Sequence, residues 1–222
     1  MEERVAIFID GSNLYHALES NFRRHDLNFT AFADKLRGTR RLFRIYYYNV
    51  LQDINQNPDT FRQQQEFLDA LRKTHYLEPR LGSTKLSQGV PVEKGIDIML
   101  ATDLLYFAWN NSYDTAILVS GDSDFAYALQ TVKNAGKHIE VAYFESGISK
   151  DLLDIVDNCH LLNRDYLQDL WVSKRFGLRR RVLRGKIVPH QTTPAVQVPQ
   201  NQPSTSIVVA RPPAPLQWDE PL

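Results

Sequence analysis

Two carboxylates, Asp122 and Asp124, follow an apolar run in the segment TAILVSGDSDF. The N-terminus repeats the arrangement, because the apolar run 5–9 ends in Asp10 and is followed closely by Asn13. If both runs are strands of one parallel sheet, their carboxyl ends meet at the edge where such sheets bind ligands. Carboxylates that converge without His or Cys favour Mg²⁺ or Mn²⁺. These ions activate water and clamp the oxygens of a phosphodiester, so the spacing favours metal-dependent phosphodiester hydrolysis.

A structural alternative applies to the same acids, because Asp and Asn are preferred at helix N-termini. Asp10 would cap a helix that starts at Ser12, with Asn13 exposed in its first turn. Asp122 would cap a helix near residue 123, and Asp124 would complement the positive end of its dipole. One cap needs one acid, so two acids after one strand lean toward a ligand role.

A third contributor is the segment EKGID, in which Gly95 marks a junction between loop and helix. Asp97 then lies in the first helical turn and faces the sheet edge. Asp103 lies about 120° further round the helix, so the two acids do not face one point. We expect Asp97 to bind the metal. Asp103 is either an acid that supports the site from behind or a structural partner of a nearby cation.

Basic and hydroxyl side chains near these acids are candidates for supporting roles. Lys94, Arg80 and Lys85 are candidate contacts for a substrate phosphate or strand, with ordinary solvated surface positions as the alternative. Ser12 and Ser120 adjoin the acids and are candidates to orient them.

Alternating strand and helix patterns predict the scaffold that would hold this site. The expected strands are 4–9, 40–51, 76–81, 115–120, 138–143 and 160–162, and the expected helices are 12–24, 29–36, 59–73, 95–110, 124–135 and 150–156. This alternation indicates an α/β fold with a mostly parallel sheet covered on both faces. Strand alternation also places rings of Tyr46, Tyr47 and Tyr48 in the core rather than on a base-stacking surface, and Cys159 is expected to be a buried apolar side chain.

The charge is unevenly distributed. The formal net charge is zero, but residues 1–172 hold 18 basic and 24 acidic residues, and 174–186 holds seven basic residues and no acid. An acidic core disfavours strong unassisted binding to nucleic acid. The single cysteine excludes an intramolecular disulfide and a Cys-rich zinc site. Without a signal-like N-terminus or a long apolar run, the sequence predicts a cytoplasmic protein with no membrane partner.

Three regions follow from the composition. Residues 1–172 form the expected folded domain. Residues 173–187 form a basic segment, either an arm for nucleic acid or another anionic surface, or a solvated linker. Residues 188–222 hold most of the prolines and are expected to be a disordered tail, a candidate site for a protein partner.

Three ordered motifs, FIDGSNLYHAL, EKGIDIMLATDLL and TAILVSGDSDFAYALQTVKNAGKHIEVAYF, resemble the NYN domain, closest to its bacterial LabA-like branch. That resemblance covers about residues 3–170. It implies a PIN-like α/β/α sandwich and a divalent-metal nuclease that acts on RNA, and it allows a homodimer. The family's site residues correspond to Asp10, Asn13, Asp97, Asp122 and Asp124, none of them substituted.

Two functions therefore compete. In the first, the protein is an Mg²⁺- or Mn²⁺-dependent ribonuclease, expected to be endonucleolytic, that serves RNA processing or regulation. In the second, the fold is an RNA-binding or regulatory module that cleaves poorly and acts through partners. A haloacid-dehalogenase-like phosphatase is disfavoured, because its second acid would occupy the position of Ser12.

Overall fold

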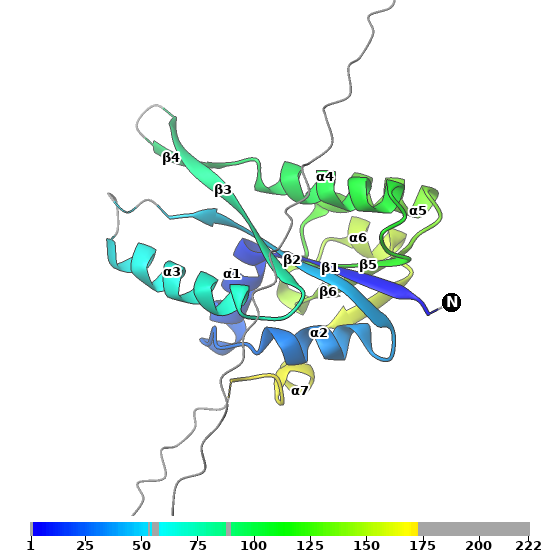
Figure 1. The fold of residues 1–222 in the computed structure, drawn as a ribbon, viewed down its shortest axis with the longest axis horizontal. Helices are drawn as coiled ribbons and strands as arrows, with labels where there is room; N and C mark the ends of the chain where they lie inside the picture. The colour runs from blue at the N-terminus through cyan, green and yellow to red at the C-terminus, as the bar shows by residue number, and fades with distance from the viewer. Residues whose placement is uncertain (1, 53, 55–57, 88–89, 173–222) are drawn as a thin grey trace, which may run out of the picture. The chain divides into compact units, whose positions relative to one another are not determined.

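A seven-stranded sheet forms the centre of the folded domain (Figure 1). The computed structural model describes residues 2–52, 54, 58–87 and 90–172. The strands are β1 (Arg4–Asp10), β2 (Arg41–Leu51), β3 (Leu77–Ser87), β4 (Val90–Lys94), β5 (Thr115–Val119), β6 (His138–Tyr143) and β7 (Asn158–Leu161). Their order is β4-β3-β2-β1-β5-β6-β7, and every neighbouring pair is parallel except β3 and β4.

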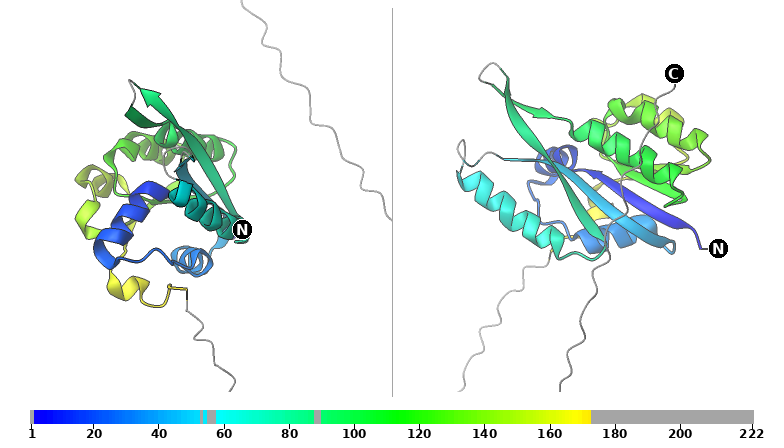
Figure 2. Two further views of the ribbon diagram at one scale, coloured as in Figure 1. Left: turned by 90° about the vertical axis from the view of Figure 1, so that its left-hand side faces the viewer. Right: turned by 45° about the horizontal axis from the view of Figure 1, so that its top comes forward.

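Helices cover both faces of this sheet (Figures 1 and 2). One face packs against α1 (Gly11–Phe22), α2 (Phe29–Arg37), α3 (Pro58–Arg72) and α7 (Arg164–Leu167). The other packs against α4 (Ile96–Trp109), α5 (Ala126–Asn134) and α6 (Lys150–Ile155). Two short 3₁₀ helices, η1 (Ser123–Phe125) and η2 (Glu145–Gly147), precede α5 and α6.

Strand β1 shows how the sequence builds these layers. Val5, Ile7 and Ile9 belong to the core cluster on the α1 face, and Ala6 and Phe8 belong to the cluster on the α4 face. All five are at most 1% exposed, because side chains alternate between the two faces of a strand that is covered on both sides. The predicted three-layer α/β/α sandwich is therefore confirmed.

The strand order reverses beside β1. From β1 the chain proceeds through β2, β3 and β4 toward one edge, and then crosses to β5, β6 and β7 on the other side. The carboxyl ends of β1 and β5, which pair in parallel, are thus the topological switch point of the sheet.

The β3–β4 hairpin was not predicted (Figure 2). Strand β3 continues to Ser87 instead of ending at Leu81, and β4 pairs with it antiparallel. The sequence in this region is polar and rich in turn-forming residues, which is typical of a loop. Pro91 is tolerated in β4 because an edge strand does not need every N–H group for the ladder. Helix α7 was also not predicted.

The aromatic and cysteine predictions had different outcomes. Tyr46, Tyr47 and Tyr48 are all at most 3% exposed, which confirms their core location. The prediction for Cys159 was wrong, because this side chain is exposed on β7, the edge strand of the sheet.

The predicted basic segment 173–187 and the predicted disordered tail 188–222 lie outside the described residues. Within the part of the chain that the structure describes, no helix combines the length and the apolar composition needed to cross a membrane.

Candidate metal centre

The acids of the two motifs lie at the switch point of the sheet. Asp10 is the last residue of β1, and Asp122 follows β5 after Ser120 and Gly121. The backbone is tightly packed here: a Cβ atom on Gly121 would lie 1.8 Å from the carbonyl oxygen of Gly147. Only glycine lets these loops approach so closely.

Asp10 is a buried carboxylate with both oxygens hydrogen-bonded. It is 6% exposed, and its Oδ1 accepts the backbone N–H of Asn13 at 3.0 Å. Its Oδ2 accepts the hydroxyl of Ser120, itself 2% exposed, at 3.1 Å. A carboxylate oxygen has more than one acceptor direction, so both oxygens keep capacity for a further ligand.

Ser120 and Asn13 connect the two strand ends. The Ser120 Oγ atom accepts the N–H of Asp122 at 3.2 Å, and Asn13 Oδ1 accepts the N–H of Gly121 at 3.4 Å. The loop after β5 is therefore tied by hydrogen bonds to the first turn of α1. Ser120, a candidate to orient the acids, thus contacts the Asp10 carboxylate and the backbone of Asp122.

The helix-cap alternative is also realised in this structure. Asp10 is the N-cap of α1, and Asp122 Oδ1 accepts the N–H of Asp124 at 3.0 Å as the N-cap of η1. Capping explains why the chain turns at both acids. Asp124 and Asp97 are exposed and lie in the first turns of η1 and α4, where a carboxylate complements the positive end of the helix dipole.

Four carboxylates lie near enough to one another for their charges to interact. Burial raises the pKa of Asp10, hydrogen bonds from Asn13 and Ser120 oppose this rise, and the charges of Asp97 and Asp122 add to it. Burial also raises the pKa of Asp97, and the charges of Asp122 and Asp124 raise it further. Acids from β1, α4 and the β5 loop thus share one region of negative potential, which favours a cation.

Asp103 and Arg80 form a separate group beside this region. The Tyr48 hydroxyl donates to Asp103 Oδ2 at 2.9 Å, and Arg80 Nε lies 3.8 Å from the same oxygen. Arg80 also pairs with Glu78 at 3.0 Å and is in register with Tyr48, which is itself in register with Asp10. Arg80 therefore stands two strands from the acids, about 10 Å away at the usual strand spacing.

The remaining candidates lie on different elements. Lys85 lies in β3. Lys94 is the last residue of β4, where its backbone pairs with that of Ser83 in β3. Ser12 is in the first turn of α1 and lines a pocket on the α1 face of the sheet.

The side chains do not surround a single point. Among the described residues, no group of three or more His, Cys, Asp or Glu side chains is arranged to hold a metal ion. The donor set itself fits a hard cation, because it consists of carboxylate, amide and hydroxyl oxygens.

Comparison with known protein families gives the class of the protein. The NYN domain model matches residues 4–163, so the chain belongs to the NYN domain family, which is part of the PIN-like nuclease superfamily. The chain is also similar to the low amplitude and bright protein LabA of Synechococcus elongatus, with 28% identity over 173 residues, 72% of this chain and 84% of LabA. A solved protein of unknown function from Vibrio parahaemolyticus shares the fold, with a TM-score of 0.63, 22% identity and coverage of 75% of this chain and 96% of that one.

Proposed function

We propose that the protein is a divalent-metal-dependent ribonuclease that hydrolyses phosphodiester bonds within an RNA strand. The observation that carries the proposal is the shared field of Asp10, Asp97, Asp122 and Asp124 at the switch point of an NYN fold. Helix capping alone would not bring an acid from α4 to the ends of β1 and β5.

The four carboxylates would hold Mg²⁺ or Mn²⁺, with Asn13 as a further oxygen donor. Such an ion supplies activation of water and stabilisation of the negative charge that develops on the phosphate oxygens. Asp10 is already fixed by Asn13 and Ser120, so it would bind without rearrangement. Asp97 and Asp124 are exposed and would turn toward it when positive charge offsets their repulsion.

The described part of the folded domain offers few positively charged side chains for RNA binding near the acids. Arg80 is engaged by Glu78 and Asp103, so a phosphate would compete with two carboxylates for it. We propose that the basic residues of 173–187 supply additional attraction for RNA, through release of counterions. Lys85 and Lys94 remain proposed contacts. A cytoplasmic location, a protein partner for residues 188–222 and a homodimer belong to the same proposal.

The experiment is cleavage of end-labelled single-stranded RNA by the full chain with Mn²⁺, Mg²⁺ or EDTA. We expect internal cuts that require the metal and that fall at least about 100-fold in Asp122→Asn. Asp69→Asn is the matched control, since Asp69 is an exposed α3 acid paired with Arg72 at 2.9 Å. Cleavage that survives EDTA, or equal cleavage by Asp122→Asn, contradicts the proposal.

The second candidate is an RNA-binding or regulatory module that retains the fold without efficient cleavage. The observation in its favour is that the carboxylates do not close around one point among the described residues. RNA binding by a folded wild-type protein that leaves the RNA intact with either metal would select this alternative.

A further inference from the structure

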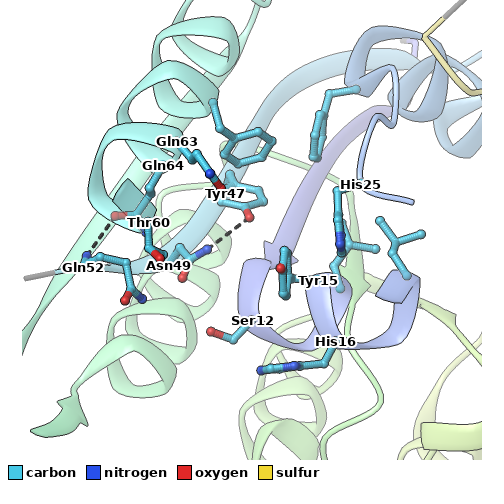
Figure 3. Close-up of a pocket in the computed structure, with 14 residues that line it drawn as sticks. Ser12, Tyr15, His16, His25, Tyr47, Asn49, Gln52, Thr60, Gln63 and Gln64 are labelled. Atoms are coloured by element: carbon cyan, nitrogen blue, oxygen red, sulfur yellow. Dashed lines mark hydrogen bonds between the residues drawn. The ribbon is translucent and has the colours of Figure 1, made fainter. Parts of the chain in front are cut away.

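A pocket of about 420 Å³ lies on the α1 face of the sheet (Figure 3). Its walls are α1 and α3, and Tyr47 and Asn49 of β2 lie between them. This volume is within the range of pockets that enclose small organic ligands. The lining is Ser12, Leu14, Tyr15, His16, Leu18, His25, Phe29, Tyr47, Asn49, Gln52, Thr60, Gln63, Gln64 and Phe67.

The lining mixes apolar and polar side chains, and among the described residues it contains no Asp, Glu, Lys or Arg. Phe29, Phe67 and two leucines form its apolar part. Amides, hydroxyls and imidazoles provide hydrogen-bonding groups. The described lining offers no Lys or Arg to attract a phosphate and no cluster of carboxylates to bind a metal. It suits a flat, neutral ligand with several donors and acceptors, which describes a nucleobase.

Tyr15 provides a surface on which a base can stack. Its ring is 50% exposed and lies parallel to the His25 ring, with centroids 4.1 Å apart and planes inclined by 8°. Figure 3 shows Tyr15 in the space between α1 and α3, with His25 on its far side. A base on the open face of Tyr15 would extend this stack, and stacking of this kind tolerates every base.

Side-chain amides around the stack fall into two groups. Those of Asn49 and Gln64 are held by the protein, through Tyr47 Oη at 3.2 Å and the Val50 carbonyl at 2.8 Å. The side-chain amides of Gln52 and Gln63 make no hydrogen bond to the described part of the chain and are available to the edge of a base. The first group shapes the pocket, and the second can read its ligand.

The pocket adjoins the metal centre through the backbone of Gly11. Ser12, which lines the pocket, lies between Asp10 and Asn13 in the sequence. Tyr47, part of the pocket floor, is so close to Gly11 that an added Cβ atom would lie 2.5 Å from its Cζ. A base in the pocket would therefore direct its own sugar and phosphate toward the first turn of α1 and the acids.

We propose that this pocket binds a nucleobase of the RNA strand next to the scissile phosphate. This inference rests on the proposed function for its choice of ligand, but it is tested without cleavage. It assigns to Tyr15 the role of stacking platform and to Gln52 and Gln63 the role of contacts to the base edge.

The test is titration of the full chain, in EDTA, with the four nucleoside 5′-monophosphates and with ribose 5-phosphate. Calorimetry and the NMR signals of the pocket rings measure binding. We expect a nucleotide to bind more tightly than ribose 5-phosphate. Tyr15→Ala should weaken it about tenfold, and Tyr15→Phe should retain it. The matched control is Tyr106→Ala, since Tyr106 is a 60% exposed tyrosine on α4, across the sheet.

Equal binding of ribose 5-phosphate, or unchanged binding in both Tyr15→Ala and Gln63→Ala, would overturn the inference. Gln63→Ala keeps the test valid if Tyr15→Ala does not fold. Metal-dependent RNA cleavage without nucleotide binding in EDTA would overturn the pocket and leave the ribonuclease proposal standing. Nucleotide binding that depends on Tyr15, without any RNA cleavage, would support the nucleobase pocket and contradict the ribonuclease proposal.

Discussion

The Ser120 hydroxyl donates a hydrogen bond to Asp10 Oδ2 at 3.1 Å across the switch point of the sheet. The Ser120 Oγ atom in turn accepts the N–H of Asp122 at 3.2 Å, so one serine contacts both strand-end acids. Both Ser120 and Asp10 are buried. Residues that orient metal ligands in this way usually affect metal affinity nearly as strongly as the ligands themselves.

Ser120→Ala should therefore weaken Mn²⁺ binding by about 10- to 100-fold. The hydrogen bond from Ser120 lowers the pKa of Asp10, so its removal should raise that pKa further. A larger fraction of Asp10 is then protonated at mildly acidic pH, so the defect should be greater at pH 5.5 than at pH 7.5. Calorimetric Mn²⁺ titration at the two pH values measures this effect. Ser20→Ala, an exposed position on α1, is the control, and an equal defect at both pH values would contradict the expectation.

Asp10→Asn should stabilise the metal-free protein at neutral pH. Asn is as good an N-cap as Asp, so the α1 cap survives while the buried charge is removed. Because the folded-state pKa is raised above 3.8, the charged carboxyl costs stability at neutral pH and costs none once it is protonated. We expect the Tm of metal-free Asp10→Asn to exceed that of the wild type at pH 7, by a difference that shrinks as the pH falls toward 4.

Two controls accompany this substitution. Asp10→Ala should be about 1 kcal/mol less stable than Asp10→Asn, because both variants remove the charge and only Ala also removes the cap. Mn²⁺ should raise the Tm of the wild type and leave that of Asp10→Asn unchanged. Thermal melts with and without metal therefore separate the capping role of Asp10 from its proposed ligand role. A Tm for metal-free Asp10→Asn below that of the wild type would show that the buried charge does not destabilise the folded protein.

Gly121→Ala should disturb the β5 loop. Its new Cβ atom would meet the carbonyl oxygen of Gly147 at 1.8 Å, so the backbone must move and carry Asp122 with it. We expect a loss of about 3 kcal/mol in the free energy of unfolding, measured by urea denaturation. Gly147→Ala is the matched control, because a Cβ atom there has no neighbour within 4 Å. Equal stabilities of the two variants would refute the packing argument.

Acid unfolding should depend on Glu140, which is 7% exposed. Burial alone would raise its pKa, but hydrogen bonds from His160 at 2.8 Å and Arg40 at 2.6 Å lower it to about 2. The stabilisation is complete above the ordinary value of 4.5 and is lost as the pH falls toward 2. Glu140→Gln should cost about 3 kcal/mol at pH 7 and much less at pH 3. Urea denaturation at both pH values measures the difference, and equal losses would contradict it.

The strands that carry the candidate site were predictable because they are buried on both faces. Runs such as that of β1 are continuously apolar and end abruptly at a polar residue, so both the element and its terminal acid are visible in the sequence. The β3–β4 hairpin was not predictable in this way, since an edge hairpin lacks the apolar pattern of a covered strand. The prediction that Cys159 is buried was wrong for a related reason. Whether a side chain on an edge strand is buried depends on which other elements cover that strand.

The pocket residues carried no comparable signal. Tyr15 and Gln63 are single side chains on the exposed parts of two helices, and only the packing of α1 beside α3 brings them to one cavity. The separation of Asp97 from Asp103 could be inferred from helical periodicity alone. Partners such as Tyr48 for Asp103 depend on tertiary contacts between β2 and α4 that the sequence does not specify.

The central claim is that Asp10, Asp97, Asp122 and Asp124 form one divalent-metal site. The most direct measurement is Mn²⁺ binding, followed by electron paramagnetic resonance and calorimetry, for the wild type and for the four single Asp→Asn variants. The account predicts saturable binding by the wild type, weakened at least about tenfold by each substitution, with Asp69→Asn unchanged. Absence of saturable Mn²⁺ binding by the folded wild type, or binding that none of the four substitutions alters, would contradict it.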